Sequence, residues 1–366
     1  MDKLNKGLKV IEKLNNLSYE AYIVGGAVRD FLLGKKVLDI DITTNASVED
    51  ICSIFNRYDL KASKYSGVTV FYEGEAFEIT TFRKDLSYID HRHPTVCFVK
   101  DVTDDLVRRD FTMNAMIMDY KKNVIDIYGG KKSLENKIIS CIGHPDTRFN
   151  EDSLRVLRAL YFSSKLGFKL DNDIIDSIVR FDYVSYLPKE YIKDMLEKII
   201  NQPYSLGLEY IVKYNILKGF PFYQVLAEEC YKYKVKKKDM YALFYALHGF
   251  LPKNELITNE EYKYAKEVGN LVKNKFASFD LYLSKGKYIK EAEELYGIIF
   301  DHIDATKLYN ELEIHSISDI DFDFGTLPNQ KIRSFVQRVV EERIINHELA
   351  NNCKDILSFI YLRRLL

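Results

Sequence analysis

The segment at residues 22–43, YIVGGAVRDFLLGKKVLDIDIT, constrains the fold of this chain more than any other. Its first three residues predict a short buried strand, and Gly25 and Gly26, which lack a Cβ atom, predict a tight turn. Residues 27–33 follow as a predicted helix that a glycine ends. Backbone N–H groups at such a helix start point toward an anion, and Arg29 adds a positive charge in the first turn. The pattern therefore predicts a strand, a turn and a helix that bind a triphosphate.

Two carboxylates follow this turn on a predicted strand. Residues 37–42 alternate apolar and acidic side chains, so Asp39 and Asp41 should project from one face while the apolar residues pack behind. Two adjacent like charges need a counter-charge, and Mg²⁺ takes oxygen ligands and completes its shell with triphosphate oxygens and water. A later strand, predicted at residues 76–82, presents Glu78 as a third carboxylate. The sequence thus predicts Asp39 and Asp41 as Mg²⁺ ligands and all three carboxylates as the catalytic cluster of a nucleotidyl-transfer site.

Each of these motifs has a plainer interpretation when it is taken alone. A Gly-Gly pair before a helix is commonly a simple turn, and an acidic pair on a strand is commonly a solvated face. Glu78 alone would be an ordinary exposed strand residue. The occurrence of the motifs together at this spacing favours nucleotidyl transfer. A dinucleotide-binding turn is excluded, because the third glycine of G-x-G-x-x-G is absent and Val28 and Arg29 follow instead.

Composition limits the class of protein. A chain of 366 residues, 47% of them hydrophobic, can bury a large core and is expected to divide into two or more domains. The five cysteines are scattered without a CxxC or metal-ligand spacing, which indicates reduced thiols and predicts a cytoplasmic location. The longest apolar run, at residues 240–251, is too short to span a bilayer, so no membrane association is predicted.

Two basic segments interleaved with tyrosine stand out against a formal net charge of −1. They are YKYKVKKK at residues 231–238 and KGKYIK at residues 285–290. Taken alone, each is more typical of a solvated helix face than of an RNA-binding groove. They gain significance only if the N-terminal half acts on an RNA.

Polar residues gather in two further places. Residues 84–94, KDLSYIDHRHP, predict a polar loop, whose His91 and His93 indicate substrate contact or solvation rather than a metal site. In the later segment RRDFTMNA, the paired Arg108 and Arg109 beside an aspartate would serve a ribose and phosphates. The ordinary interpretation of these arginines is a surface ion pair of little energetic value.

A helix predicted to open at Glu151 carries an acid and a base suited to reading a nucleobase. Asp152 and Arg155 lie three residues apart and therefore on one helical face. An ion pair within the helix is the ordinary interpretation. Turned toward a ligand, the pair offers an acceptor beside a donor, which matches cytosine and adenine, whereas uracil and guanine present the reverse order. Such a site would select CTP and ATP without a template, because the wrong bases leave buried polar groups unpaired.

Several segments, in order, resemble the tRNA nucleotidyltransferase (CCA-adding) and bacterial poly(A) polymerase family. They are GGAVRDFLLG with the following DID, FEITTFR, YIDHRHP, RRDFTMNAM, DIYGG and RFNEDSLRVLRALYFSSKLGF, and they cover about the first half of the chain. The resemblance implies an α/β head, a polymerase-β-like nucleotidyltransferase with a small mixed sheet, followed by an all-α neck, body and tail. The expected divisions are a catalytic head at 1–140, a base-recognising neck at 141–200, a body at 201–270 and a tRNA-binding tail at 271–366.

The resemblance also assigns roles to individual residues. Arg158 would support the two base readers, whereas Tyr161 stands where many relatives have an arginine, which puts one nucleotide contact in question. The residues expected to bind the nucleotide are Gly25, Gly26, Arg29, Arg109, Asp152, Arg155, Arg158 and Tyr161.

The activity implied is two-metal transfer of nucleotidyl groups from CTP and ATP to the 3′-hydroxyl of tRNA, with Mg²⁺ as the cofactor and the tRNA acceptor arm as the partner. Residues 84–94 correspond to the family's flexible segment, which is linked to the switch from C to A addition. Four alternatives remain: an enzyme that adds only A, one that adds only CC, a poly(A) polymerase, and a catalytically silent RNA-binding protein. The GKRF-type segment associated with the poly(A) polymerase branch is not apparent at residues 60–73, which favours CCA addition.

Overall fold

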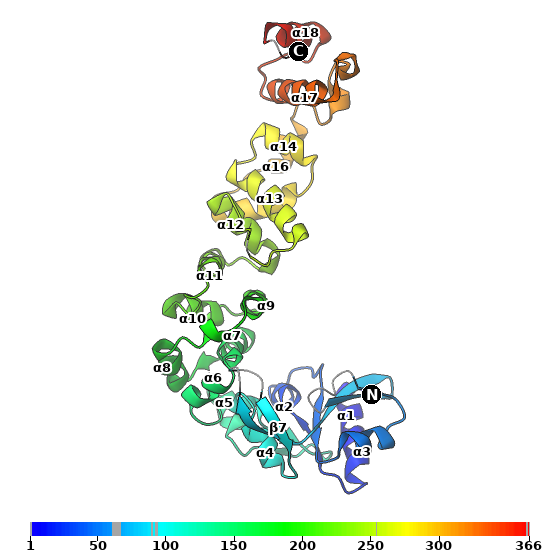
Figure 1. The fold of residues 1–366 in the computed structure, drawn as a ribbon, viewed down its shortest axis with the longest axis vertical. Coiled ribbons are helices and arrows are strands. Elements are labelled where there is room, and N and C mark those ends of the chain that lie inside the picture. Colours follow the sequence, from blue (N-terminus) through cyan, green and yellow to red (C-terminus); the bar gives the residue numbers. More distant parts are fainter. Residues whose placement is uncertain are drawn as a thin grey trace. The chain divides into compact units, whose positions relative to one another are not determined.

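The computed structural model describes residues 2–60, 67–88, 91, 94–253, 255–363 and 365. The chain forms two compact units, Met1–Ala227 and Glu228–Leu366, which run from blue to green and from green to red in Figure 1. The first unit contains an α/β head and the helices that follow it, and the second unit is helical. The predicted fold class is therefore confirmed. The division into head, neck, body and tail at the predicted boundaries stays a prediction.

Within the described residues, the head is built on a seven-stranded mixed sheet with the strand order β3-β4-β5-β2-β1-β8-β9. β2 and β5 run parallel, and the other neighbouring strands run antiparallel. The strands are β1 (Ala21–Val24), β2 (Asp41–Thr44), β3 (Tyr58–Asp59), β4 (Gly67–Tyr72), β5 (Glu75–Thr81), β8 (Ile117–Met118) and β9 (Val124–Ile125).

The turn after β1 has the geometry that its glycines predict. Gly25 has a φ of 75°, a left-handed conformation that side chains with a Cβ atom rarely adopt, and α2 (Gly26–Leu32) begins directly after it. A Cβ atom on Gly25 would lie 3.9 Å from Oδ2 of Asp41 and 3.6 Å from Nη1 of Arg109. The strand, turn and helix predicted for this segment are confirmed, and the turn lies beside a carboxylate of β2.

β2 is shorter than predicted. It begins at Asp41, so Asp39 precedes the strand, and Leu38 is 62% exposed rather than packed behind it. The pairing with β1 explains the difference. Val24, the last residue of β1, lies opposite Asp41, and beyond it the chain turns away at the glycine pair. The prediction of a strand over residues 37–40 is therefore wrong, because β1 offers those residues no backbone partner.

The two faces of the sheet differ in what covers them. α1 (Lys3–Asn15) packs closely on one face, where a Cβ atom on Gly7 would lie 3.1 Å from Ile40 and 3.4 Å from Phe77. Phe77 is fully buried there. Because side chains alternate along a strand, Glu78 points to the opposite face, where it is exposed. The face that carries the carboxylates is thus available to a ligand.

Residues 84–94 form the predicted loop only in part. β6 (Arg83–Tyr88) and β7 (Pro94–Phe98) pair as an antiparallel two-stranded ribbon. Its side chains are half-buried or exposed throughout, so the ribbon lacks the alternation of buried residues from which strands are predicted. The remainder of the predicted loop, including Arg92 and His93, lies outside the described residues except for His91.

The predicted helix through Asp152 is interrupted. α6 (Pro145–Glu151) ends just before Asp152, and α7 (Leu154–Leu166) begins after a further residue. Asp152 itself is extended, with φ −138° and ψ 100°, and its Oδ1 accepts a hydrogen bond from the Leu154 N–H at 3.0 Å. Short polar side chains that bond nearby backbone compete with helix formation. The prediction that Asp152 and Arg155 share one helical face is therefore wrong.

The other elements of the first unit flank the sheet and continue the chain after it (Figure 1). They are α3 (Val48–Ile54), α4 (Val102–Val107), η2 (Thr112–Asn114), α5 (Gly130–Asn136), β10 (Ile138–Ile139), β11 (Lys169–Leu170), α8 (Asn172–Arg180), η3 (Val184–Tyr186), α9 (Lys189–Ile200), α10 (Leu206–Tyr214) and α11 (Pro221–Tyr233), the last of which crosses into the second unit. α7 packs against α9 and α10.

The second unit contains helices alone in its described residues, and its C-terminal part is built around apolar side chains of α17 and α18. No helix in the described part of the chain is both long enough and apolar enough to cross a membrane. The elements are η4 (Lys237–Asp239), α12 (Met240–His248), α13 (Asn259–Lys273), α14 (Ser278–Ser284), α15 (Ile289–Ile299), α16 (Ala305–Asn310), η5 (Ile317–Asp319), η6 (Phe324–Thr326), α17 (Gln330–Ile345) and α18 (Cys353–Leu362).

Tyr264 of the second unit connects the neighbourhoods of the two basic segments. The Tyr264 hydroxyl donates a hydrogen bond of 2.6 Å to Asp239, which follows the first segment. The ring of Tyr264 also makes an edge contact with Tyr288 of the second segment, with 5.1 Å between ring centroids. Residues 231–238 and 285–290 together are called the lysine–tyrosine patch below.

Candidate active site

One cleft in the first unit gathers most of the predicted site residues. It has a volume of about 610 Å³ and is lined by seven basic and four acidic side chains, so it is positive although the chain carries a net charge of −1. The predicted residues that line it are Gly25, Gly26, Arg29, Asp41, Arg109, Asp152, Arg155, Arg158 and Tyr161.

Of the three predicted carboxylates, Asp41 lines this cleft, whereas Asp39 and Glu78 are not among its lining residues. Asp41 and Glu78 are directly paired residues of the parallel strands β2 and β5. Asp41 is exposed to the cleft, yet desolvation by the surrounding protein raises its pKa; Arg109 opposes this shift and the Asp39 carboxylate adds to it. Burial likewise raises the pKa of Glu78, with the charge of Asp41 as the second cause. The Asp39 charge therefore makes ionisation of Asp41 more costly, and the Asp41 charge does the same for Glu78.

The chemistry of these three side chains fits a divalent cation. Asp39, Asp41 and Glu78 accept no hydrogen bond from any residue in the described ranges. Carboxylate oxygens are the ligands that Mg²⁺ prefers, and a cation would relieve their mutual repulsion. Among the described residues, however, no three His, Cys, Asp or Glu side chains converge closely enough to hold an ion. The assignment of Asp39 and Asp41 as metal ligands stays a prediction.

Arg29 provides the predicted positive charge beside the glycine turn, in a fixed orientation. Its side chain is 3% exposed, and Nη1 donates a 2.7 Å hydrogen bond to Oδ1 of Asn114. Its guanidinium also pairs with Asp30 at 2.8 Å and lies over the ring of Phe162, 5.3 Å from the centroid.

Asp105 of α4 organises the paired arginines. It is fully buried and accepts hydrogen bonds from Arg108, at 3.0 and 2.8 Å, and from Arg109, at 3.1 Å. It also accepts from the Thr43 hydroxyl on β2 and from the Arg83 N–H on β6. Burial raises the pKa of Asp105, but the two guanidinium groups outweigh burial and hold the pKa below its usual range. The arginines are thus anchored to a buried carboxylate rather than forming a surface ion pair.

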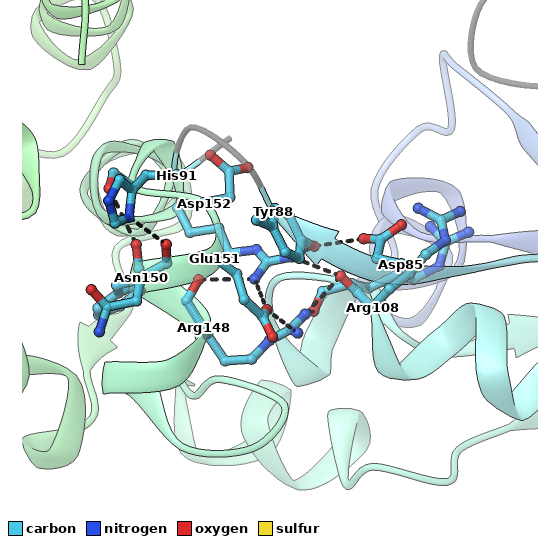
Figure 2. A network of polar contacts seen from close by, with 12 residues as sticks. Asp85, Tyr88, His91, Arg108, Arg148, Asn150, Glu151 and Asp152 are labelled. Carbon is cyan, nitrogen blue, oxygen red and sulfur yellow. Dashed lines mark hydrogen bonds and ion pairs between the residues drawn. The ribbon is translucent and has the colours of Figure 1, made fainter. Parts of the chain in front are cut away.

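Arg155, the predicted base reader, is enclosed by hydrogen bonds, in the network that Figure 2 shows around Tyr88, Glu151 and Arg108. Its Nη1 donates to the Arg148 carbonyl at 2.9 Å and to the Glu151 carboxylate at 2.8 Å. Its Nη2 donates to the Tyr88 hydroxyl at 3.2 Å and to the Arg108 carbonyl at 3.0 Å. A guanidinium has five N–H donors, so in this conformation most of its capacity is already used.

Tyr88 connects the β6–β7 ribbon to this network. Its hydroxyl donates a 2.6 Å hydrogen bond to Oδ2 of Asp85 and accepts the bond from Arg155. Burial raises the pKa of Tyr88 to about 12, so the phenol stays protonated at neutral pH and remains a donor. The ribbon therefore holds one of the predicted base readers in place.

His91 makes a second connection between this region and the helices. Its Nδ1 lies 2.8 Å from the Asn150 carbonyl, and its ring stacks on Tyr186 with 4.3 Å between centroids. The His91 carbonyl accepts a hydrogen bond from the Ser153 N–H, next to Asp152. His91 thus contacts the junction of α6 and α7, as the labelled side chains in Figure 2 show.

Arg158 is held mainly by Asp110, which accepts from its Nε at 2.8 Å and its Nη2 at 2.6 Å. Asp110 also accepts a 3.1 Å hydrogen bond from the Asn114 amide. Tyr161 lines the cleft with its ring, and Lys165 Nζ lies 5.6 Å from the ring centroid.

Asp105, Asn114 and Tyr88 are not among the site residues predicted from the sequence. Asp105 had a usable signal, because it precedes Arg108 and Arg109 by three and four residues, the spacing at which helical side chains meet. Tyr88 and Asn114 had none. Their partners Arg155 and Arg29 lie 67 and 85 residues away in the sequence, so only the folded chain brings them together.

A mixed sheet with carboxylates on one open face, beside a glycine turn and a cationic cleft, is the head of a nucleotidyltransferase fold. Residues 21–140 match the family described as the Poly A polymerase head domain. The resemblance to the CCA-adding and poly(A) polymerase family that the sequence motifs predicted is thereby confirmed for this part of the chain.

Curated relatives extend the similarity beyond the head. The chain is 43% identical over 202 residues to a CCA-adding enzyme of Geobacillus thermodenitrificans, which covers 55% of this chain and 50% of that protein. It is 39% identical over 234 residues to a CCA-adding enzyme of Anoxybacillus flavithermus, which covers 63% of this chain and 59% of that protein. The chain thus spans about half the length of the curated relatives it matches.

Solved structures show the same fold over the whole chain. A Bacillus stearothermophilus CCA-adding enzyme in complex with CTP superposes with a TM-score of 0.73 at 24% identity, covering 100% of this chain and 98% of that one. A Thermotoga maritima CCA-adding enzyme complexed with tRNA-CCA superposes with a TM-score of 0.65 at 16% identity, covering 99% of this chain and 95% of that one. At these identities the likeness concerns the fold alone.

Proposed function

We propose that the chain is a tRNA nucleotidyltransferase that adds or repairs the 3′-terminal CCA of tRNA from CTP and ATP without a nucleic-acid template. The observation that carries the proposal is one cleft with the Asp41 carboxylate at its glycine turn and Asp152 with Arg155 in its lining. A nucleoside triphosphate needs both kinds of group, because its phosphates require charge neutralisation and its base requires hydrogen-bond partners. The same pairing of groups favours an enzyme over a catalytically silent RNA-binding protein. A cytoplasmic location is part of the proposal.

The basic and acidic residues of the cleft would have different roles. Arg29 and Arg109 would orient the triphosphate, with the Gly25 and Gly26 backbone close to the phosphates. Asp39 and Asp41 would hold Mg²⁺, which when bound would supply Lewis-acid activation of the 3′-hydroxyl and neutralise the leaving pyrophosphate.

The base readers would act through exchange of hydrogen bonds. Asp152 accepts one bond from the Leu154 N–H through Oδ1, and Arg155 is occupied by four internal acceptors. Reading a base through Nη1 or Nη2 would require Arg155 to release at least one of them, and the Tyr88 hydroxyl is the only one of these four acceptors that belongs to the ribbon. A base that offered no acceptor in return would leave the buried guanidinium underbonded, which is costly.

An RNA substrate gives the lysine–tyrosine patch a function. Its lysines neutralise phosphates without reading sequence, and its tyrosines offer faces on which bases stack. Lys287 already lies over the Tyr288 ring, 4.3 Å from the centroid, and Lys238 lies 3.8 Å from Glu291. We therefore propose the second unit as the region that holds the tRNA, including the predicted tail at residues 271–366.

The test is incorporation of labelled CTP and ATP, singly and together, into matched tRNAs that end before CCA, after C and after CC, with Mg²⁺ present. A generic RNA serves as the substrate control. Ordered addition of C, C and A that then stops is the expected result. Addition of A only after CC, or of CC alone, would assign a divided pathway, and long A tails on the generic RNA would assign a poly(A) polymerase. Binding of tRNA without incorporation would contradict the enzyme.

A further inference from the structure

A chain of hydrogen bonds runs along the cleft from the glycine turn to α7. Nη1 of Arg29 donates to Oδ1 of Asn114 at 2.7 Å, and Nδ2 of Asn114 donates to Oδ1 of Asp110 at 3.1 Å. Oδ2 of Asp110 then accepts from Nε and Nη2 of Arg158, at 2.8 and 2.6 Å. All four residues line the cleft, and the two inner members, Asn114 and Asp110, are not among the predicted nucleotide contacts.

The chemistry of its neighbours dictates an amide at Asn114. The Arg29 guanidinium can only donate, and the ionised Asp110 carboxylate can only accept. The side chain between them must therefore present an acceptor on one side and a donor on the other. This requirement also fixes which way the Asn114 amide points. An aspartate there would place its carboxylate against that of Asp110, and a leucine would make neither hydrogen bond.

Burial makes this chain of hydrogen bonds rigid. The exposed fractions are 3% for Arg29, 7% for Asn114 and 8% for Asp110, so each lost hydrogen bond would leave a desolvated polar group. Burial raises the pKa of Asp110, but Arg158 and the Asn114 amide outweigh burial and hold the pKa below its usual range. Phe162 lies against both guanidinium groups, 5.3 Å from Arg29 and 5.4 Å from Arg158. A reorientation of one arginine thus disturbs the Phe162 ring on which the other arginine packs.

We propose that Asn114 is a positioning residue that couples Arg29, at the glycine turn, to Arg158, on α7, so that the two arginines bind a nucleoside triphosphate as one unit. This inference rests on the proposed function, which supplies the nucleotide, and adds the coupling between the two arginines. Asn114 acts through its neighbours and need not touch the reacting atoms.

The test is a double-mutant cycle on nucleotide affinity, without RNA or turnover. Dissociation constants of labelled CTP and ATP are measured by equilibrium dialysis for Arg29→Lys, Arg158→Lys and the double variant. The cycle is then repeated with Asn114→Leu added throughout. With Asn114 present, the change in dissociation constant in the double variant should differ by at least about threefold from the product of the two single-variant changes, as it does for coupled neighbours. With Asn114→Leu the deviation should fall to within about 1.5-fold, because the connection is cut.

Two further variants separate coupling from general damage. Asn114→Asp keeps the acceptor for Arg29 and loses the donor to Asp110, so it should also reduce the deviation from multiplied single-variant effects. It replaces Asn114→Leu in the cycle if that variant does not fold. Asn123→Leu removes a matched amide-to-carboxylate hydrogen bond, 2.8 Å to Asp119, in a turn that does not line the cleft. It should leave both affinities within about twofold of the native chain.

The outcomes distinguish this inference from the proposed function. Multiplicative effects in the native background, or a deviation that persists in both Asn114 variants, would overturn the coupling while nucleotide binding stands. A native chain that binds neither CTP nor ATP would overturn the proposed function itself, and the coupling with it.

Discussion

At the residue scale, Asp41 has the features of a ligand-binding carboxylate rather than of a structural one. It is exposed to the cleft, accepts no hydrogen bond from the described residues and has a raised pKa. Asp105, which is a structural carboxylate, is fully buried, has five donors around it and has a lowered pKa. The contrast shows how their surroundings give Asp41 of β2 and Asp105 of α4 opposite properties.

Replacement of Asp41 should therefore separate stability from activity. Asp41→Asn is expected to lower incorporation by at least about 100-fold, the scale of losing one preorganised charge-stabilising group. Because the pKa of Asp41 is raised in the folded state, its stabilising contribution is fully present below the unfolded pKa, about 4, and is lost as pH rises through the folded pKa. At pH 7 the variant should thus melt at the same temperature as the native chain or higher.

Thermal melting between pH 3 and pH 8, with incorporation measured in parallel, tests this expectation. Added Mg²⁺ should raise the melting temperature of the native chain and have a smaller effect on Asp41→Asn. A variant that loses stability at pH 7 would show that Asp41 holds the fold together instead.

At the element scale, the β6–β7 ribbon and His91, which lies between its two strands in sequence, are attached to residues that closely follow Asp152. Tyr88 bonds to Arg155, and the His91 carbonyl bonds to the Ser153 N–H. Because a two-stranded ribbon is marginal by itself, these contacts contribute to its position. The ribbon therefore helps to hold the predicted base readers in place within the first compact unit of the chain.

Loss of the Tyr88 hydroxyl should affect both stability and nucleotide binding. In Tyr88→Phe, Asp85 loses its hydrogen bond through Oδ2, while its Oδ1 is already buried without a partner among the described residues. We expect a loss of about 1–3 kcal/mol in the free energy of unfolding, the cost of an unsatisfied buried polar group. Arg155 would also gain freedom, so the preference for CTP and ATP over UTP and GTP should narrow.

Urea denaturation and the dissociation constants of the four nucleotides measure these effects. Tyr120→Phe is the matched control, since Tyr120 is exposed on the same head and its hydroxyl makes no hydrogen bond within the described residues. Equal stability and equal selectivity in the two variants would mean that the ribbon holds nothing in place.

At the scale of the whole molecule, charge is distributed unevenly in a chain whose net charge is −1. The cleft of the first unit is positive, and so is the lysine–tyrosine patch of the second. Each suits a different part of a substrate, because a cleft encloses a nucleotide whereas an exposed patch follows a phosphate backbone.

The patch should account for part of the salt dependence of tRNA binding. Replacing the exposed Lys234, Lys285 and Lys290 with alanine should weaken binding and reduce the slope of log affinity against log salt by about two. Affinity for CTP alone should not change. Filter binding of tRNA from 50 to 300 mM salt, roughly the range in which phosphate contacts are screened, measures the slope.

A triple alanine variant of Lys307, Lys331 and Lys354, exposed in the same unit but outside the patch, is the matched control. An equal decrease of the slope in both variants would indicate a general effect of charge, and the patch would have no special part in RNA binding.

Local sequence patterns determined much of the head. The glycine turn and the strands that carry Asp41 and Glu78 follow from side-chain periodicity and from conformational preferences that act within a few residues. Because these signals are local, they can be recognised without knowledge of the fold. The ordered motifs then predicted the fold class of the whole chain.

The tertiary structure decided where the local patterns end and which distant residues meet. β2 begins only at Asp41 because β1 ends opposite that residue. The helix predicted through Asp152 is interrupted because the Asp152 side chain accepts a hydrogen bond from the Leu154 backbone. The connections from Arg29 to Asn114 and from Tyr88 to Arg155 cross 85 and 67 residues of sequence. Hydrogen bonds across such separations carry no periodic signal, so only the packed chain reveals them.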